Sequence, residues 1–352
     1  MNFRMRDSLC GRGLMNREIF ENIEMKRITL QTNGLMTISW LKDRVIDWGN
    51  SGRQYLLNGQ VQELGGYYFS FPFDSAITSD NGVYSAIYQN LGTKGLLLKN
   101  GKILREINRS YYQADVYEYP IAFATLKNGK TYLIHCPNEY CQLDLEEVET
   151  GEIVTQTKER KPSDFFHSRL EVSPDNKKLI SKGWGWHPFD FVELFDIDEA
   201  LSNPLSLDKS KTEPGVAGEI CAASFINNDT ILIGSPSETE EFEERISERL
   251  GPGQIATWNI RTNTISKPVN PDFIVGGHLT PIDKTYAWDL FDFPKIINYN
   301  TGKIVEKIES IFSGKQKSSI ISAQDDLPKI SFNRQTKQVA IASDNKIEIL
   351  SP

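Results

Sequence analysis

Residues 170–181 read Leu-Glu-Val-Ser-Pro-Asp-Asn-Lys-Lys-Leu-Ile-Ser, and this stretch decides the fold. A short apolar strand leads into Pro174-Asp175-Asn176, and a second apolar strand follows it. This turn sequence favours a tight reversal, because Pro fixes φ and Asn tolerates the left-handed conformation. The stretch therefore predicts a β-hairpin.

The same strand–turn–strand pattern recurs along the whole chain. Its turns are Lys42-Asp43, Asp80-Asn81-Gly82, Lys127-Asn128-Gly129, Pro174-Asp175-Asn176, Asn227-Asn228-Asp229, Asp283-Lys284 and Asn333-Arg334-Gln335. A period of roughly 40–55 residues between such units is typical of propeller blades. The repeat therefore indicates a ring of similar units rather than a layered α/β domain.

A second set of turns leads to an outer strand in most units. These turns are Asn58-Gly59, Asn100-Gly101, Thr150-Gly151, Thr262-Asn263 and Thr301-Gly302. Strand, tight turn, strand, loop, strand, tight turn and strand together make one four-stranded antiparallel blade. We predict an all-β fold, a seven-bladed β-propeller, with six and eight as the alternative blade counts.

Two features of these units resemble a known family. The segment Leu170–Ser181 is similar to the strand pair of WD40-like repeats, in which Ser-Pro-Asp-Gly forms the turn, and the Thr-Gly turns followed by Glu or Lys resemble those of related bacterial propellers. No unit carries the Gly-His and Trp-Asp pairs of true WD40 repeats in register. The resemblance implies a WD40-like bacterial β-propeller and does not specify a function.

The two ends of the repeat complement each other. Leu327 to Leu350 supply three strands for the last blade, and Met25–Leu30 forms a strand without a blade of its own. We expect this strand to complete the last blade, which closes the ring and protects its sheet edge. The predicted organisation is a polar leader over 1–24, loosely ordered or a short helix, with Met15 as an alternative start, and one propeller domain over 25–352.

Propeller topology separates tight turns from long loops. The first-to-second and third-to-fourth turns lie at one end of the ring, here the turn face; the remaining loops and the connections between blades lie at the other, the loop face. The loop-face segments are rich in aromatic and acidic residues. We selected as candidate binding residues Tyr67, Phe71, Tyr112, Phe166, Trp184, Trp186, His187, Phe189, Asp190, Trp288, Asp289, Phe291 and Asp292.

Two of these loops have similar sequences. Residues 186–191 read WHPFDF and residues 288–293 read WDLFDF, which predicts one loop design in alternate blades. Rigid aromatic side chains beside fixed acceptors are typical of protein-binding surfaces. The alternative is that single Phe and Tyr residues pack between blades while the acid caps a loop amide. The pair Trp184 and Trp186 favours exposure of at least one indole.

A longer loop in the fifth blade predicts a helix over Ser237–Leu250. Ser237 and Glu240 form a capping box, and Gly251-Pro252 ends the helix. Phe242, Ile246 and Leu250 share one stripe, and glutamates cover the other faces. This helix is either packed on the rim by its stripe or a negatively charged docking arm.

Charge restricts the class of partner. Lys and Arg number 39 against 47 Asp and Glu, which gives a formal net charge of −8. A nucleic-acid-binding protein needs a clustered positive field, and here the cations are scattered. There is no apolar run near the ~18 residues of a membrane helix. We therefore expect a cytoplasmic monomer whose partner is a basic protein or peptide, with no nucleic acid, membrane, cofactor or metal.

Four cysteines are too few for a disulfide framework. Cys136 and Cys141 fall in the segment His135-Cys136-Pro137-Asn138-Glu139-Tyr140-Cys141. Two free thiols are the favoured interpretation, because the spacing is not that of a zinc site. A disulfide across a hairpin and a metal site with His135 are the alternatives.

Two functional hypotheses follow. The first is a non-catalytic propeller that binds a protein or peptide through an aromatic and acidic loop face; an inhibitor or immunity role against a basic toxin is a specific version. The second is a hydrolase or lyase at the channel mouth, using His167, His187 and His278 with Asp164, Asp190 or Asp292. The sequence lacks a nucleophile elbow, a phosphate loop and a zinc-protease motif, so we assign no catalytic residue.

Overall fold

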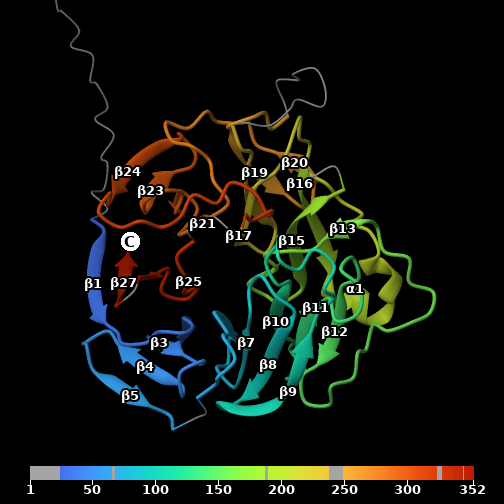
Figure 1. Ribbon diagram of the computed structural model, residues 1–352. Coiled ribbons are helices and arrows are strands. Elements are labelled where there is room, and N and C mark those ends of the chain that lie inside the picture. Colours follow the sequence, from blue (N-terminus) through green and yellow to red (C-terminus); the bar gives the residue numbers. More distant parts are fainter. Residues whose placement is uncertain (1–23, 66–67, 187–188, 238–248, 323–326, 344) are drawn as a thin grey trace, which may run out of the picture.

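The computed structural model describes residues 24–65, 68–186, 189–237, 249–322, 327–343 and 345–352. These residues form seven antiparallel sheets arranged as blades around a central channel, so the predicted seven-bladed propeller is confirmed (Figure 1). The predicted leader and most of the predicted helix 237–250 lie outside the described residues. Within the described part of the chain, no helix combines the length and apolar character needed to cross a bilayer.

Blades one, two, five and six have four strands in chain order. Blade one contains β2 (Ser39–Leu41), β3 (Arg44–Asp47), β4 (Arg53–Leu56) and β5 (Val61–Glu63). Blade two contains β6 (Ser75–Thr78), β7 (Tyr84–Tyr88), β8 (Lys94–Lys99) and β9 (Lys102–Asn108). Blade five contains β17 (Ala222–Asn227), β18 (Thr230–Gly234), β19 (Ile255–Asn259) and β20 (Thr264–Ile265). Blade six contains β21 (Leu279–Pro281), β22 (Tyr286–Asp289), β23 (Lys295–Asn298) and β24 (Lys303–Lys307).

Blade three has a shortened outer edge. Its strands are β10 (Ile121–Thr125), β11 (Thr131–His135) and β12 (Asp144–Glu147). The predicted outer strand after Thr150-Gly151 pairs through a single bridge between Glu146 and Ile153. The turn itself forms as predicted, with Gly151 at φ 76°.

Blade four has an interrupted inner strand. Both β13 (Phe165–Phe166) and β14 (Glu171–Val172) pair with β15 (Lys178–Gly185), which pairs in turn with β16 (Phe189–Asp196). At Gly183 a Cβ atom would lie 1.9 Å from the Phe166 carbonyl oxygen, so only glycine permits this approach.

The outer side of blade four is covered by short helices. After β16 the chain forms α1 (Ile197–Ser202) and the 3₁₀ helix η1 (Pro204–Leu207). The Asp196 side chain caps α1 by accepting from the Glu199 N–H at 2.8 Å. These helices pack against the apolar core that blades three and four share.

The N-terminal strand closes the ring, as predicted. Blade seven consists of β25 (Ile330–Phe332), β26 (Val339–Ser343), β27 (Lys346–Ser351) and the outermost strand β1 (Lys26–Gln31), which lies beside β27 (Figure 1). Lys26 pairs with Ser351, and the register continues to Gln31 with Lys346. The two ends of the repeat therefore share one sheet.

The core lies between neighbouring blades, and buried tryptophans bridge them. The Trp40 Nε1 donates to the Ser331 carbonyl at 3.0 Å, which connects blade one to blade seven. The Trp288 indole is completely buried, and its Nε1 donates to the Lys337 carbonyl in the β25–β26 turn at 2.7 Å. Because the indole is buried and its hydrogen bond reaches a turn of the neighbouring blade, Trp288 is a packing residue between blades six and seven.

Candidate functional site

Four of the aromatic candidates gather in blade four and the adjacent loops of the loop face. Tyr112 follows β9, Tyr140 lies in the β11–β12 loop, Phe166 ends β13, and Trp184 and Trp186 lie at the end of β15. We call these five residues the aromatic platform. Tyr140 was not among the candidates chosen from the sequence; it is one residue before Cys141, in the segment that was considered for its thiols.

Strand register builds the base of the platform. Phe166 pairs with Trp184 across β13 and β15, and their rings stack with centroids 3.8 Å apart and planes 1° apart. Side chains two positions apart share one face of a strand. Trp186 accordingly continues the stack, with its centroid 5.8 Å from both Phe166 and Trp184.

Burial separates the base of the platform from its outer surface. Phe166 is fully buried and Trp184 is 5% exposed, whereas Trp186 is 50% and Tyr112 40% exposed. The prediction that at least one tryptophan of the pair is exposed is therefore confirmed. A rigid base holds exposed rings in place, so little side-chain entropy remains to be lost when a partner binds.

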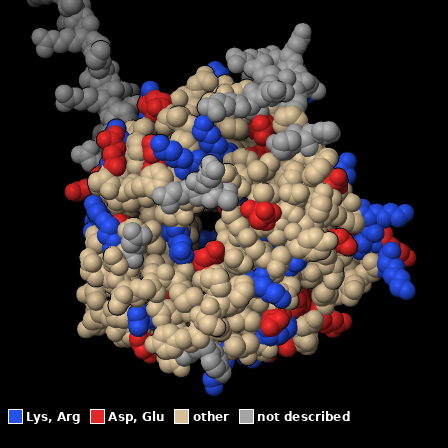
Figure 2. Space-filling view, in the orientation of Figure 1, with Lys and Arg blue, Asp and Glu red and all other residues tan. Residues whose placement is uncertain are grey.

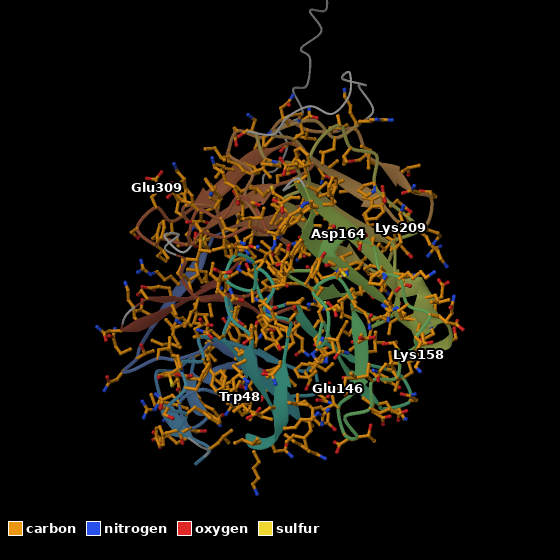
Figure 3. All side chains as sticks on the ribbon, turned by 45° about the vertical axis from the view of Figure 1, so that its right-hand side comes forward. Trp48, Glu146, Lys158, Asp164, Lys209 and Glu309 are labelled. Atoms are coloured by element: carbon orange, nitrogen blue, oxygen red, sulfur yellow. The ribbon has the colours of Figure 1, made fainter. Side chains whose placement is uncertain are left out.

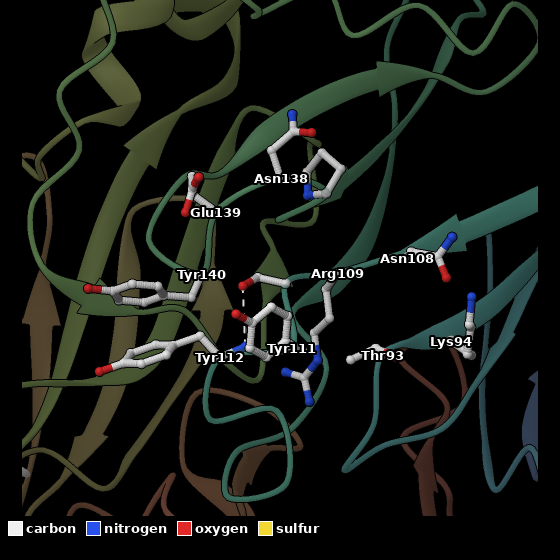
Figure 4. Close-up of a pocket in the computed structure, with 11 residues that line it drawn as sticks. Thr93, Lys94, Asn108, Arg109, Tyr111, Tyr112, Asn138, Glu139 and Tyr140 are labelled. Carbon is white, nitrogen blue, oxygen red and sulfur yellow. Dashed lines mark hydrogen bonds between the residues drawn. The ribbon is translucent and has the colours of Figure 1, made fainter.

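The tyrosines join the platform to a surface pocket of about 840 Å³ (Figure 4). The Tyr112 and Tyr140 rings lie beside each other, with centroids 5.0 Å apart, and Tyr140 stacks on Phe166 at 4.3 Å. The pocket is lined by Thr93, Lys94, Asn108, Arg109, Ser110, Tyr111, Tyr112, Pro137, Asn138, Glu139 and Tyr140. Aromatic rings, amides and charges of both signs thus meet in one hollow.

Arg109 fixes the loop that carries Tyr112. Its buried guanidinium donates to the carbonyls of Gly92, Asn90, Ala114, Tyr117 and Glu118 at 2.6–3.3 Å. The cation also lies over the Tyr117 ring, 4.4 Å from its centroid. A planar guanidinium can satisfy this many acceptors at once, which a lysine ammonium cannot.

Carboxylates flank the platform. The Tyr140 hydroxyl donates to Asp164 Oδ1 at 2.7 Å, and burial together with this neighbouring carboxylate raises the Tyr140 pKa. Glu139 lines the pocket beside it. Among the described residues, neither Asp164 nor Glu139 forms an ion pair with a Lys or Arg. These two acidic groups are therefore available to a cationic partner.

A second aromatic group forms elsewhere in the ring. Phe71 is exposed, and its ring lies tilted against Phe73 with centroids 4.8 Å apart; Phe73 in turn packs with Trp48 between blades one and two. Figure 3 shows Trp48 in the blue blade, well away from Asp164 on the green part of the chain. Phe71 thus lies apart from the aromatic platform. Tyr67 and His187, also candidates, lie outside the described residues.

The candidates of blade six are mostly internal. Asp289 is buried, accepts from the Phe291 N–H at 3.0 Å and pairs with Lys295 at 3.2 Å, and Phe291 is also buried. Burial raises the Asp289 pKa to about 6 despite the attraction of Lys295. Asp292 remains partly exposed and pairs with Lys315. For these residues the packing alternative fits better than a binding role.

The proposed likeness between the two Trp-containing loops is wrong at the level of structure. Trp186 lies beyond the end of β15, whereas Trp288 lies inside β22. Asp190 lies inside β16, whereas Asp292 lies in the loop after β22. The eight-residue β15 is longer than the four-residue β22, so residues of the same type in the two sequences lie at different positions in the two hairpins.

Asp190 holds a long connection across the loop face. Residues 313–321, between β24 and β25, form a strap over the channel mouth. The Asp292 N–H donates to Gly314 at 2.6 Å, the Gly277 N–H to Gln316 at 2.8 Å, and the Ile321 N–H to Val116 at 2.8 Å. The Ser319 N–H donates to Asp190 Oδ1 at 2.9 Å. The strap thereby links blade six to blades four and three.

The two described candidate histidines, His167 and His278, form no hydrogen bond with the candidate aspartates Asp164, Asp190 and Asp292. His167 hydrogen-bonds the Cys141 carbonyl and the Ser181 hydroxyl, and burial lowers its pKa to about 3. His278 hydrogen-bonds Gln316 Oε1 at 2.8 Å, and burial lowers its pKa. Within the described ranges, no three His, Cys, Asp or Glu side chains are placed to hold a metal. Cys136 and Cys141 are free thiols.

Comparisons with known proteins support the fold alone. No family model matches this chain, and no curated protein matches it. The chain is similar to a chain of the solved structure titled "Crystal Structure of Mitotic Checkpoint Complex", with a TM-score of 0.54 and 14% identity over 100% of this chain and 98% of that one. At this identity the likeness concerns architecture alone, and the protein has the fold of a seven-bladed β-propeller.

Proposed function

We propose that this propeller is a non-catalytic interaction module that binds a basic protein segment on its aromatic platform. The observation that carries the proposal is the half-exposed Trp186 ring stacked over the buried Phe166 and Trp184. Tryptophan in a rigid setting supplies a large contact area, and tryptophan is enriched among the residues that dominate interface energies. The similar solved structure is titled as a complex, which agrees with a binding role.

The flanking groups favour a cationic ligand. An arginine guanidinium stacks on aromatic faces and pairs with carboxylates, and a cation over Trp contributes about 0.5–2 kcal/mol. Trp186 offers the face, and Asp164 and Glu139 offer carboxylates without a cationic partner among the described residues. The net charge of −8 adds a long-range attraction that accelerates encounter with basic partners.

We expect the attraction to a basic partner to act at the platform rather than over a whole face. Figure 2 shows Lys and Arg interspersed with Asp and Glu on the face in view, without a large patch of one sign. Binding therefore depends on short-range stacking and ion pairing, with a modest salt dependence. An inhibitory role against a basic toxin is one form that such an interaction takes.

The proposal is tested by titrating the full chain with a peptide of alternating Arg and Gly. Calorimetry and tryptophan fluorescence report binding, and a peptide of alternating Asp and Gly serves as the charge-reversed control. We expect the basic peptide to bind, and Trp186→Ala and Asp164→Asn each to weaken it about tenfold or less, as the loss of one stacked or ion-paired contact implies.

Phe312→Ala is the matched control, because Phe312 is another loop-face aromatic with 46% exposure, outside the platform. It is expected to leave affinity unchanged. Equal weakening by Phe312→Ala and Trp186→Ala would show that binding is not located at the platform. Equal affinity for the acidic peptide would contradict the expected charge preference.

A further inference from the structure

The turn-face end of the central channel is a cavity that the aromatic platform does not use. Two adjoining hollows of about 350 and 460 Å³ share the lining residues Asp80, Leu170, Val172, Phe332, Arg334 and Gln335. Small-molecule sites commonly have volumes of about 300–1,000 Å³, so this end of the channel is large enough for a ligand.

The cavity is cationic although the protein is acidic. Lys42, Lys182, Arg334 and Lys337 line it, against the carboxylates Asp80 and Glu171. The chain as a whole has a net charge of −8. A local excess of positive charge inside a hollow with apolar walls concentrates the field and attracts anions.

The Glu171 carboxylate already forms hydrogen bonds and an ion pair with other residues of the protein. It receives hydrogen bonds from Ser224 Oγ at 2.9 Å and from the Phe225 N–H at 3.0 Å, and it pairs with Lys182 at 3.0 Å. Arg334 Nη2 remains 3.9 Å from this carboxylate. Glu171 therefore neutralises Lys182 well and Arg334 poorly.

Two lysines at the cavity mouth lack a carboxylate partner. Among the described residues, Lys42 and Lys337 form no ion pair. Both lie in turns between first and second strands, and each lines one of the two hollows. Burial, with a contribution from Arg334, lowers the Lys337 pKa, while Glu171 and Asp283 oppose part of that shift.

Arg169 adds further positive charge in the channel wall. Its Nη1 donates to the carbonyls of Cys221 and Gly277, while its buried Nη2 has no acceptor in the described part of the chain. Arg169 also opposes protonation of Lys182, whose pKa is lowered chiefly by burial. Arg169 lines neither hollow, so it contributes charge behind the wall and no direct contact with a ligand.

We propose that the turn-face end of the channel binds a small organic anion, with Arg334 and Lys337 holding its carboxylate or phosphate group. Phe332 and Phe225 line the same hollow and pack against the apolar part of the ligand. Arginine suits this role because its planar donors match oxyanion geometry in two-point contacts. This site is at the opposite end of the ring from the aromatic platform and does not depend on it.

The test measures binding of phenyl phosphate and of 3-phenylpropionate to the full chain by calorimetry at constant ionic strength. Benzyl alcohol, which is uncharged, controls for apolar binding. We expect one or both anions to bind and the alcohol not to bind; the stronger anion identifies the phosphate or carboxylate class. Absence of binding by both anions would overturn the proposal.

Variants locate the site. Arg334→Gln and Lys337→Gln are expected to weaken anion binding about tenfold each, because charge-assisted hydrogen bonds are lost. Lys284→Gln makes the same charge change in a turn of the same face that does not line the cavity, and it should have no effect. Equal weakening by Lys284→Gln and Arg334→Gln would mean that general charge, not this cavity, attracts the anion.

A fourth variant is expected to change the affinity for the anion in the opposite direction. Glu171→Gln retains an acceptor for Ser224 and Phe225 but removes the negative charge that Lys182 and Arg334 face. We expect tighter anion binding in this variant. If Glu171→Gln folds and binds the anion more weakly than the unchanged protein, the anion does not occupy the cavity next to Arg334.

Discussion

The Asp190 carboxylate accepts hydrogen bonds from both the backbone N–H and the hydroxyl of Ser319, a residue 129 positions later in the chain. Both residues are buried, so the contact fixes the strap across the channel mouth without access to solvent. Asp190 was selected from the sequence as a binding residue. Its contacts give it a structural role next to the platform.

The first prediction concerns this contact. Asp190→Ala should lower the free energy of unfolding by about 1–3 kcal/mol, because it leaves the buried Ser319 donors without an acceptor. Urea denaturation measures the loss, and hydrogen exchange should accelerate at residues 313–321. Ser319→Ala removes the hydroxyl but keeps the N–H donor, so it should cost less. Unchanged exchange in the strap would contradict this account.

The second prediction contrasts two tryptophans. Trp288→Ala should destabilise the protein by about 3–5 kcal/mol, because it opens a cavity between blades six and seven. Trp186→Ala should change stability by no more than about 0.5 kcal/mol, because the ring is half exposed. Thermal or urea unfolding measures both. A large loss of stability in Trp186→Ala would mean that Trp186 is a packing residue.

The third prediction concerns ring closure at Glu348. This buried carboxylate on β27 receives two hydrogen bonds from Arg27 at 2.8 Å, one from Thr29 at 2.7 Å, and pairs with Lys346 at 2.9 Å. The Arg27 hydrogen bonds are the main cause that lowers its pKa to about 2. Glu348→Gln should therefore cost about 1–3 kcal/mol at pH 7.

The pH dependence has a definite sign. The folded pKa of Glu348 is below its unfolded value, so its stabilisation is complete above about pH 4.5 and is lost as the pH falls towards about 2. The difference between the protein and Glu348→Gln should shrink over that range. Glu309→Gln, in an exposed pair with Lys307, is the control and should show little effect at any pH. A gap that stays constant down to pH 2 would exclude a charge effect.

The fourth prediction concerns His167. Burial holds its folded pKa at about 3, whereas the unfolded chain takes up the proton near pH 6.5. Stability should therefore fall by about 1.4 kcal/mol per pH unit on this account as the pH decreases from about 6 to 3. His167→Gln should flatten the profile of unfolding free energy against pH. Parallel profiles for the two proteins would contradict the burial effect.

The fifth prediction has the opposite sign. Burial, with a contribution from Glu213, raises the Glu193 pKa to about 7. The folded state keeps a proton that the unfolded chain releases near pH 4.5, so this group lowers stability as the pH rises to about 7. Glu193→Gln should gain stability relative to the unchanged protein between pH 5 and 8. A gain that does not depend on pH would point to packing instead.

Local chemistry made much of the fold predictable. Turn residues such as Asn100 and Gly101, and Asn176 after Asp175, adopt the positive φ expected of them, and the hairpins follow at the predicted places. The unpaired strand at Met25–Leu30 predicted ring closure, because a propeller leaves no open edge between its ends. These features are determined by residues that are near one another in the sequence.

The site was less predictable because burial depends on strand length and on distant contacts. Trp186 and Trp288 have similar neighbours in sequence, but the strands that carry them differ in length. The eight-residue β15 ends just before Trp186, whereas the four-residue β22 contains Trp288. The hydrogen bond between Asp190 and Ser319 joins residues 129 positions apart, and no local sequence pattern predicts it. Tyr140 lies in the segment that contains Cys136 and Cys141, and its ring, not the two thiols, belongs to the platform.

The pairing of Lys26–Gln31 with Lys346–Ser351 has a consequence for biosynthesis. Strand β1 can pair with β27 only after β27 has been synthesised, so blade seven forms after the other six blades have been translated. Contacts between such distant residues form slowly, and an unpaired strand edge exposed meanwhile invites aggregation. A nascent chain stalled before Lys346 would therefore present an open ring to chaperones and proteases.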